Sequence, residues 1–466
     1  MPAERASARS PVERPITLAE LRSHASYADA WIAINGTVYD ITDFIPQHPF
    51  GDSFRGHLGT ECGGLFSSAH ARVGVEERLE SEAFRAANGI RLVGQLAIGR
   101  ERLCGDGPEP LLERLLYRDT HRDAFWQELK SEVGAFLREN DESLHYSTAE
   151  GAAHLLYHLA IYLGLSYLAW FEGSVLAAYL LGIHMICALA DVAHMATHFG
   201  FTRCRPLNFL AAHLFDLSGA SGLEWQITHQ THHHQPHSAI DHQTNVYGYI
   251  GTRIHGYVEH RPYHRSQPIH FWLTLSLYLP FRIVSTSAWL IMNRQFVRHG
   301  YEIVAHVVAK GLLLAQIAYC AYAQGLWTAL LVFGAYAVAY SQTAFVLLFN
   351  DHEETHRLLS DTAELSGLHR ALSWAEVQVR TSNNWYPTNW LGAFIQFHYG
   401  YFNHHIEHHL FPTFKPSLLR KISPIVRKLC RKHGLPYLST PFLDVQRSLQ
   451  THIVKMARPD KATPVR

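Results

Sequence analysis

Residues 399–412 read YGYFNHHIEHHLFP, and this stretch predicts a metal-binding helix around which the chain is arranged. His405, His408 and His409 stand at positions i, i+3 and i+4, so on a helix their imidazoles project from one face and can converge on a metal ion. Glu407 lies between them as a candidate hydrogen-bonding partner. Two clusters of similar spacing occur upstream, so the fold must bring three distant segments together.

The upstream clusters are HMATH at residues 194–198 and HQTHH at residues 229–233. A further histidine, His352, follows an apolar segment in FNDHEETH, where His356 competes for the same role. Nine histidines are more than one metal ion can bind, so the pattern predicts two ions. Imidazole ligands suit iron, copper, zinc and nickel, so the spacing by itself leaves the metal open. The predicted ligands are His194, His198, His229, His232, His233, His352, His405, His408 and His409.

The composition is unusual in histidine, with 34 residues against 40 Lys plus Arg and 40 Asp plus Glu. The balanced charge gives no argument for a nucleic acid partner. The six cysteines contain no CxxC pair, so neither a zinc ribbon nor a disulfide framework is predicted. Residues 1–15 are rich in Arg, Ser and Pro without an apolar core. They do not form a secretory signal, and we expect them to be disordered.

Residues 16–98 predict a small soluble α+β domain. The run at 31–43 alternates apolar and polar residues around Asn35-Gly36, which indicates a hairpin. His48 and His70 follow about twenty residues apart, and two such histidines can clasp a haem iron from opposite sides. His57 is the rival second ligand, and two ordinary loop histidines are the alternative interpretation.

The stretch INGTVYDITDFIPQHPFGD resembles the signature of the cytochrome b5 haem-binding domain. The resemblance implies a bound haem b whose axial ligands fall on His48 and His70. One departure is visible, because the family's HPGG reads HPFG here. Phe50 therefore takes the place of the first glycine.

The remaining chain predicts an all-α integral-membrane domain at residues 151–440, between a linker with an amphipathic helix at 99–150 and a C-terminal tail at 441–466. Residues 152–170, 175–190, 303–322 and 326–349 are apolar and near the roughly 20 residues that cross a bilayer. Residues 268–292 carry Pro280 and Arg282 centrally, so we expect an interfacial or re-entrant helix. Lys310 lies inside the third apolar segment.

Two of the histidine clusters precede residue 268, and the third follows residue 349. They can meet only on one side of the membrane, so an even number of crossings must separate them. This predicts four transmembrane helices, with the haem domain and all histidine clusters on the cytosolic face. Arginines between the second span and the interfacial helix agree with that orientation. We expect the endoplasmic reticulum in a eukaryote and the inner membrane in a bacterium.

A tethered one-electron carrier is useful to a redox-active metal, so the haem domain favours iron and dioxygen chemistry over zinc. The pattern HxxxH, HxxHH, HxxHH, with WAEVQVRTSNNW at 374–385, resembles the integral-membrane fatty acid desaturases. With the haem domain it is similar to their front-end and sphingolipid branch. The resemblance implies two non-haem iron ions held by these histidines, dioxygen, and a lipid acyl substrate such as an acyl-CoA, phospholipid or sphingolipid. It also implies an NAD(P)H-dependent cytochrome b5 reductase or its equivalent as electron donor.

We therefore expect a front-end acyl desaturase. A sphingolipid long-chain-base desaturase or an acyl hydroxylase would use the same scaffold. A membrane haem protein that only carries electrons is the alternative from another class. Two departures concern the site: front-end enzymes commonly have glutamine at the position of His405, and HMATH lacks the aspartate often found after its first histidine, although Asp191 stands three residues before it.

Overall fold

The computed structural model describes residues 14–48, 50–70, 75–97, 123–232, 252–254, 259–352 and 373–459. The predicted disordered N-terminus lies almost wholly outside these residues, as do most of the predicted linker, His233 and His356. His232 is described only as the last residue of a helix.

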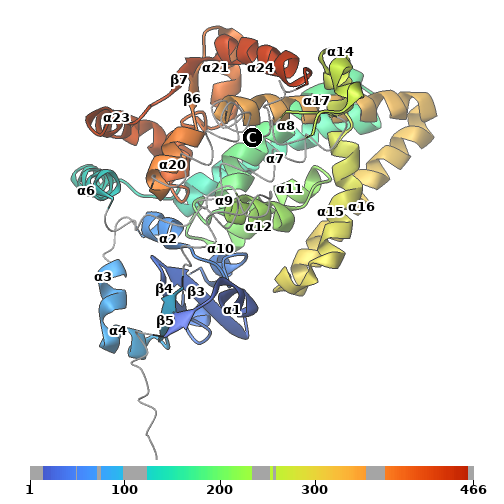
Figure 1. The fold of residues 1–466 in the computed structure, drawn as a ribbon. Helices are drawn as coiled ribbons and strands as arrows, with labels where there is room; N and C mark the ends of the chain where they lie inside the picture. Colours follow the sequence, from blue (N-terminus) through green and yellow to red (C-terminus); the bar gives the residue numbers. More distant parts are fainter. Residues whose placement is uncertain are drawn as a thin grey trace, which may run out of the picture.

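The N-terminal domain is built on a five-stranded sheet in the order β1-β5-β4-β3-β2 (Figure 1). Strands β1 and β5 are parallel, and the other neighbours are antiparallel. The predicted hairpin is confirmed as β3 and β4, whose two-residue turn places Asn35 and Gly36 at φ of 51° and 83°. The elements are β1 (Pro15–Ile16), α1 (Leu18–Ser23), β2 (Ala25–Ser26), β3 (Asp29–Ile34), β4 (Thr37–Asp40), η2 (Ile45–Gln47), η3 (Gly51–Phe54), α2 (Gly63–Ala69), α3 (Val75–Glu80), α4 (Glu82–Ala87) and β5 (Arg91–Leu96).

The two predicted haem ligands follow short helices of this domain. His48 comes directly after η2, and His70 caps the C-terminus of α2. Alternate residues of β3, such as Ile32 and Ile34, are buried in the core between the sheet and these helices. Because side chains alternate between the two faces of a strand, the apolar positions of β3 determine which face of the sheet these helices cover. The loops that carry His48 and His70 lie on that face.

Four helical segments are long and apolar enough to cross a membrane, which confirms the predicted number. They are Thr148–Phe171 (α7, Thr148–Ser166, with η6, Tyr167–Phe171), Val175–Thr197 (α8, Val175–Ala188, with η7, Leu189–His194, and α9, Met195–Thr197), Gly300–Gln324 (α16) and Leu326–Asp351 (α17). The segment predicted to be interfacial or re-entrant forms α14 (Gln267–Leu275) and α15 (Tyr278–Met292). Their axes bend by 67°, which is the geometry of a broken span or a re-entrant pair.

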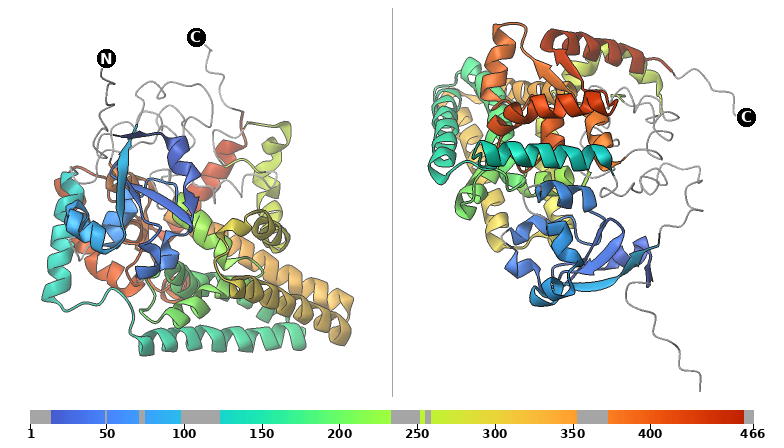
Figure 2. Two further views of the ribbon diagram at one scale, coloured as in Figure 1. Left: turned by 90° about the horizontal axis from the view of Figure 1, so that it is seen from below. Right: turned by 90° about the vertical axis from the view of Figure 1, so that its left-hand side faces the viewer.

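The remaining elements cover one end of this bundle. In Figure 2, α6 lies between the N-terminal domain and the C-terminal helices, and its buried face packs against α23. Strands β6 and β7 form a small parallel sheet. The elements are α6 (Ala124–Glu139), α10 (Arg205–Ala212), α11 (Leu214–Leu217), α12 (Gly222–His232), η9 (Pro262–Ser266), η10 (Arg294–Phe296), α20 (Trp374–Thr381), β6 (Asn384–Tyr386), α21 (Trp390–His398), α22 (His405–Leu410), α23 (Pro416–Lys432), β7 (Ser439–Pro441) and α24 (Phe442–Met456).

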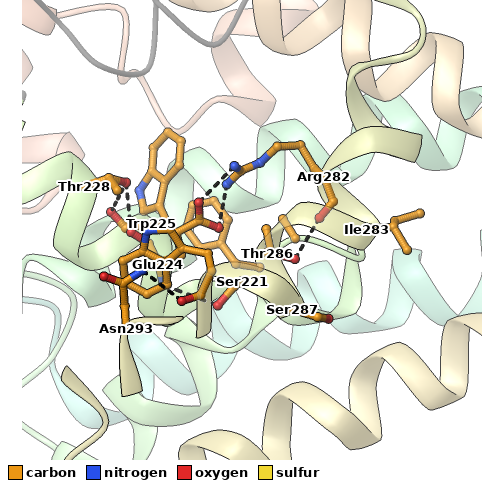
Figure 3. A network of polar contacts seen from close by, with 12 residues as sticks. Ser221, Glu224, Trp225, Thr228, Arg282, Ile283, Thr286, Ser287 and Asn293 are labelled. Atoms are coloured by element: carbon orange, nitrogen blue, oxygen red, sulfur yellow. Dashed lines mark hydrogen bonds and ion pairs between the residues drawn. The ribbon is translucent and has the colours of Figure 1, made fainter. Parts of the chain in front are cut away.

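Charged side chains inside the bundle are paired with partners on neighbouring helices. Lys310 of α16 donates hydrogen bonds to the hydroxyl groups of Thr286 and Ser287 at 2.6 and 2.9 Å, so it faces the bundle. Arg282 of α15 forms two parallel hydrogen bonds, of 2.9 and 2.8 Å, with the carboxylate of Glu224 on α12 (Figure 3). The bidentate pair ties the bent α14–α15 segment to the helix that carries His229.

We expect Glu224→Ala to lower the free energy of unfolding by about 3–5 kcal/mol, because the Arg282 guanidinium would stay buried without its partner. Thermal unfolding of the detergent-solubilised protein measures the change. The control is Asp444→Ala, which removes a solvent-exposed pair with Arg447 and should cost less than about 1 kcal/mol. Equal losses in the two variants would show that the buried pair does not stabilise the bundle.

Candidate metal centre

The first histidine cluster lies at the end of the second membrane-spanning segment. The helix there widens into the π-helical turn η7, which ends at His194, and α9 follows with His198 as its C-cap. Such π-helical insertions occur frequently at functional sites. Both imidazoles are buried and point to the same side of the helix.

These two side chains meet His229 and His408 to form the first histidine group. The Nε2 atom of His194 lies 3.1 Å from that of His198 and 2.5 Å from that of His229. The ring of His408 lies 4.8 Å from that of His194, centre to centre. Trp225, one helical turn before His229, stacks on it at 4.9 Å and fixes the plane of its ring.

The second histidine group contains His352, His405 and His409. The Nε2 atom of His405 lies 2.9 Å from that of His352 and 3.1 Å from that of His409. The opposite nitrogens of two of these rings are held by α20. Nδ1 of His352 contacts the carbonyl of Thr381 at 2.9 Å, and Nδ1 of His409 contacts the side-chain oxygen of Gln378 at 2.7 Å.

This arrangement fits metal binding because the acceptor oxygens fix the tautomers. A ring that donates its Nδ1 proton to an oxygen presents an unprotonated Nε2, and the Nε2 atoms of His352 and His409 both face that of His405. One proton on His405 can satisfy only one of these two lone pairs, whereas a cation among the three nitrogens would be bound by all of them. Each group offers ligand atoms that lie within 4.8 Å of one another.

The structure thus brings together seven of the nine predicted ligands in two groups. The side chain of His232 and all of His233 lie outside the described residues. Helix α22 supplies both groups, His408 to the first and His405 with His409 to the second. The ring of Phe402 packs against His194, His405 and His408, so the two groups adjoin.

The expectation for Glu407 differs from its observed environment. Its buried carboxylate accepts hydrogen bonds from the side chains of Asn384 and Tyr437, both at 2.8 Å, rather than contacting a histidine. Burial raises the pKa of Glu407. The carboxylate anchors α22 from behind, on the face opposite the metal site.

Sequence reasoning missed two residues that support the centre, and Asp351 is a third supporting residue. Gln378 and Thr381 orient ligand rings, and the only signal for them was their i, i+3 spacing within WAEVQVRT. Asp351 is buried, and its two oxygens accept hydrogen bonds from Trp385 at 3.0 Å and Tyr399 at 2.7 Å. Its nearest oxygen lies 3.8 Å from Nδ1 of His405.

An apolar cavity of about 70 Å³ reaches both groups. His194, His229 and His405 line it at one end. Along α17 its wall consists of residues at helical spacing, which run from Asp351 to Tyr340. The cavity therefore extends roughly 16 Å along the helix from the level of the histidines into the bundle.

A second cavity, of about 310 Å³, contains the two predicted haem ligands. The rings of His48 and His70 lie 6.2 Å apart between centres and are inclined by 74°. Two metal–nitrogen bonds of about 2 Å each, with the ring radii, account for most of this separation. Nδ1 of His70 contacts the carbonyl of Phe66 at 2.8 Å, which leaves Nε2 facing the cavity. Burial lowers the pKa of His48 to about 4, so its ring is neutral at physiological pH.

The rival ligand, His57, also lines this cavity, and its side chain hydrogen-bonds to Gln230 of α12. This bond turns it toward the membrane domain. The geometry therefore favours His48 and His70 as the pair that faces across the cavity.

Comparison with known proteins agrees with this division of the chain. The model of the fatty acid desaturase family matches residues 166–441, and that of the cytochrome b5-like heme/steroid binding domain matches residues 17–95. The chain is 25% identical to an acyl-lipid (8-3)-desaturase of Physcomitrium patens, over 94% of this chain and 91% of the relative. It is 27% identical to fatty acid desaturase 3 of Bos taurus, over 92% of each protein. It is 25% identical to Delta(8)-fatty-acid desaturase 2 of Arabidopsis thaliana, over 92% of this chain and 90% of the relative.

No solved structure gives a significant match to the chain. The desaturase match covers more than half of the 466 residues and includes both histidine groups, and the haem-domain match covers the sheet with His48 and His70. The chain therefore belongs to the fatty acid desaturase family, as an integral membrane oxidoreductase with an N-terminal cytochrome b5-like domain.

Proposed function

We propose that this protein is a di-iron front-end acyl desaturase, which introduces a double bond into a lipid acyl chain. The observation that carries the proposal is the pair of adjoining, buried histidine groups at one end of an apolar cavity. The relatives named above, which are acyl-lipid and fatty acid desaturases along nearly the whole chain, support the same reaction.

The seven grouped histidines would hold two non-haem iron ions, one per group, with His232 and His233 completing the shell by their motif. Bound iron would supply the activation of dioxygen, with electrons provided by the haem domain. The protein groups around the rings fix the imidazole tautomers and exclude water. The side-chain oxygen of Gln378 and the backbone carbonyl of Thr381 perform the first task, and the packed ring of Phe402 contributes to the second.

The acyl chain would occupy the apolar cavity along α17. Its walls include the apolar side chains of Ile186, Leu189, Phe215, Leu347 and Leu348, and the polar groups of Tyr340 and Arg282 lie at the inner end. Dispersion and the hydrophobic effect would therefore hold the chain, and the histidines at the opposite end would select which methylenes react. The head group, whether that of an acyl-CoA, a phospholipid or a sphingolipid, would remain outside.

The N-terminal domain would bind haem b through His48 and His70 and accept electrons from an NAD(P)H-dependent cytochrome b5 reductase or its equivalent. The facing rings of His48 and His70, with Nδ1 of His70 bonded to the carbonyl of Phe66, support this assignment. In a cell, we expect the haem domain and the histidine groups on the cytosolic side of the endoplasmic reticulum in a eukaryote, or of the inner membrane in a bacterium.

Expression in a host that lacks polyunsaturated lipids, followed by profiling of fatty acids and sphingoid bases, tests the function. We expect new unsaturated acyl chains whose double bond lies between an existing one and the carboxyl end. Hydroxylated acyl chains or unsaturated sphingoid bases would replace the proposal with one of the two related activities. An unchanged lipid profile, with full haem and iron content, would contradict it.

We expect His408→Ala to abolish product formation and to reduce the non-haem iron content by about half or more, because the first group loses a ligand. The haem absorbance should remain that of the wild type. His404→Ala is the matched control, since this neighbouring ring belongs to neither group and should leave iron and product unchanged. Iron analysis and lipid profiling measure both variants. Full iron occupancy in His408→Ala would remove this residue from the ligand set.

We expect His70→Ala to lose the haem absorbance while retaining the non-haem iron, because the two cofactors are held by separate side chains. His57→Ala should keep the haem absorbance, since its ring bonds to Gln230. Absorption spectra of the purified proteins decide between the two rings. A haem lost in His57→Ala and retained in His70→Ala would reverse the assignment.

A further inference from the structure

The haem cavity is enclosed by both domains rather than by the haem domain alone. Its walls include His198, Phe199 and Pro412 of the membrane domain, together with His145, which precedes that domain in the chain. His198 also belongs to the first histidine group. One imidazole therefore separates the haem cavity from the candidate metal centre.

A buried ion pair joins the two domains beside this cavity. Nη2 of Arg55 lies 2.6 Å from Oε1 of Glu302, and the two side chains are only 4% and 7% exposed. The other carboxylate oxygen of Glu302 accepts hydrogen bonds from the backbone amides of Arg298 and His299 at the start of α16. The carboxylate is thus fixed in place by its own helix and presents one oxygen to the haem domain.

Phe50 makes a second contact, at the position where the haem-domain signature departs from HPGG. Its ring lies 5.7 Å from that of Phe199 and 6.4 Å from that of His145. Phe199 directly follows His198 and has a φ of 58°, an uncommon backbone conformation for a phenylalanine. A glycine at position 50 would have no side chain to reach either ring.

Helix α2, which His70 caps, makes the third contact. A Cβ atom on Gly64 would lie 2.3 Å from the indole of Trp374, so only glycine permits this approach of α2 to α20. The indole nitrogen of Trp126 donates to the hydroxyl of Ser67 at 2.9 Å. Ser68 donates to the carbonyl of Leu410 at 2.6 Å, one residue beyond His409.

We propose that the haem domain is stably docked on its own membrane domain in this arrangement, and that Phe50, Arg55 and Gly64 are positioning residues that hold the haem cavity against His198. The role of this docking in electron transfer rests on the proposed function. In a desaturase, the docked domain would give electrons a short, fixed path from the haem to the first histidine group. The docking itself needs neither metal nor substrate. A separate cytochrome b5 would have no access to this face.

The test uses the full-length protein with a protease site inserted between residues 99 and 122, which connect the two domains in sequence. After cleavage in detergent, we expect the wild-type haem domain to co-elute with the membrane domain. Arg55→Glu places two carboxylates together and should weaken the association by about 100-fold or more, so that the haem domain elutes separately. Gly64→Leu should release it as well, through a steric clash without any change of charge.

Two further variants define the contacts. Arg55→Lys keeps the cation and should keep most of the co-elution, whereas Phe50→Gly, which restores the family's residue, should weaken it about tenfold. Arg91→Glu is the matched control, because Arg91 is 70% exposed and pairs with Asp40 inside the haem domain. It should co-elute like the wild type. The haem absorbance of each released domain shows that it is folded.

A wild-type haem domain that separates from the membrane domain on cleavage, with its haem absorbance intact, would overturn the proposal. Co-elution of both Arg55→Glu and Gly64→Leu would overturn the positioning roles of these residues. Neither result bears on the desaturase function, which lipid profiling decides independently.

Discussion

The crowding of buried imidazole nitrogens is the constraint on which the membrane domain depends. Six rings bring their Nε2 atoms to within 2.5–3.1 Å of one another, and the ring of His408 packs beside them. Two unprotonated nitrogens at this spacing need a proton or a cation between them, and the surrounding helices hold the rings in place. The oxygens of Gln378 and Thr381 fix two of the rings, and Trp225 fixes a third. The rigidity of the surrounding bundle follows, because a loose scaffold would let the rings turn away. A site assembled in advance also spends less binding energy on ordering its ligands.

The histidine groups could be predicted because helical spacing is local information. The i, i+3, i+4 pattern of His405, His408 and His409 places three rings on one face whatever the rest of the chain does, and the parity of the membrane crossings requires the clusters to lie on one side. The hairpin at Asn35-Gly36 is local in the same sense. Which ring joins which group was not predictable, since the orientation of α22 depends on its packing against α20 and α23.

Tertiary contacts between distant segments were beyond sequence reasoning. Glu224 and Arg282 are separated by 58 residues, and nothing in either segment identifies the other as its partner. Phe50 was visible as a departure from HPGG, but its neighbour Phe199 lies about 150 residues further on, in another domain. Glu407 was misplaced for a related reason: its position between ligands suggested a contact with them, whereas helical geometry turns it to the opposite face, toward Tyr437.

The sharing of α22 between the two groups has a consequence for how the protein responds to substitution. The helix is six residues long, and His408 turns toward one group while His405 and His409 turn toward the other. The orientation of this one helix therefore sets the geometry of both groups at once. A substitution behind α22 that tilts it, for example at the Asn384 or Tyr437 partners of Glu407, would displace ligands of both groups together.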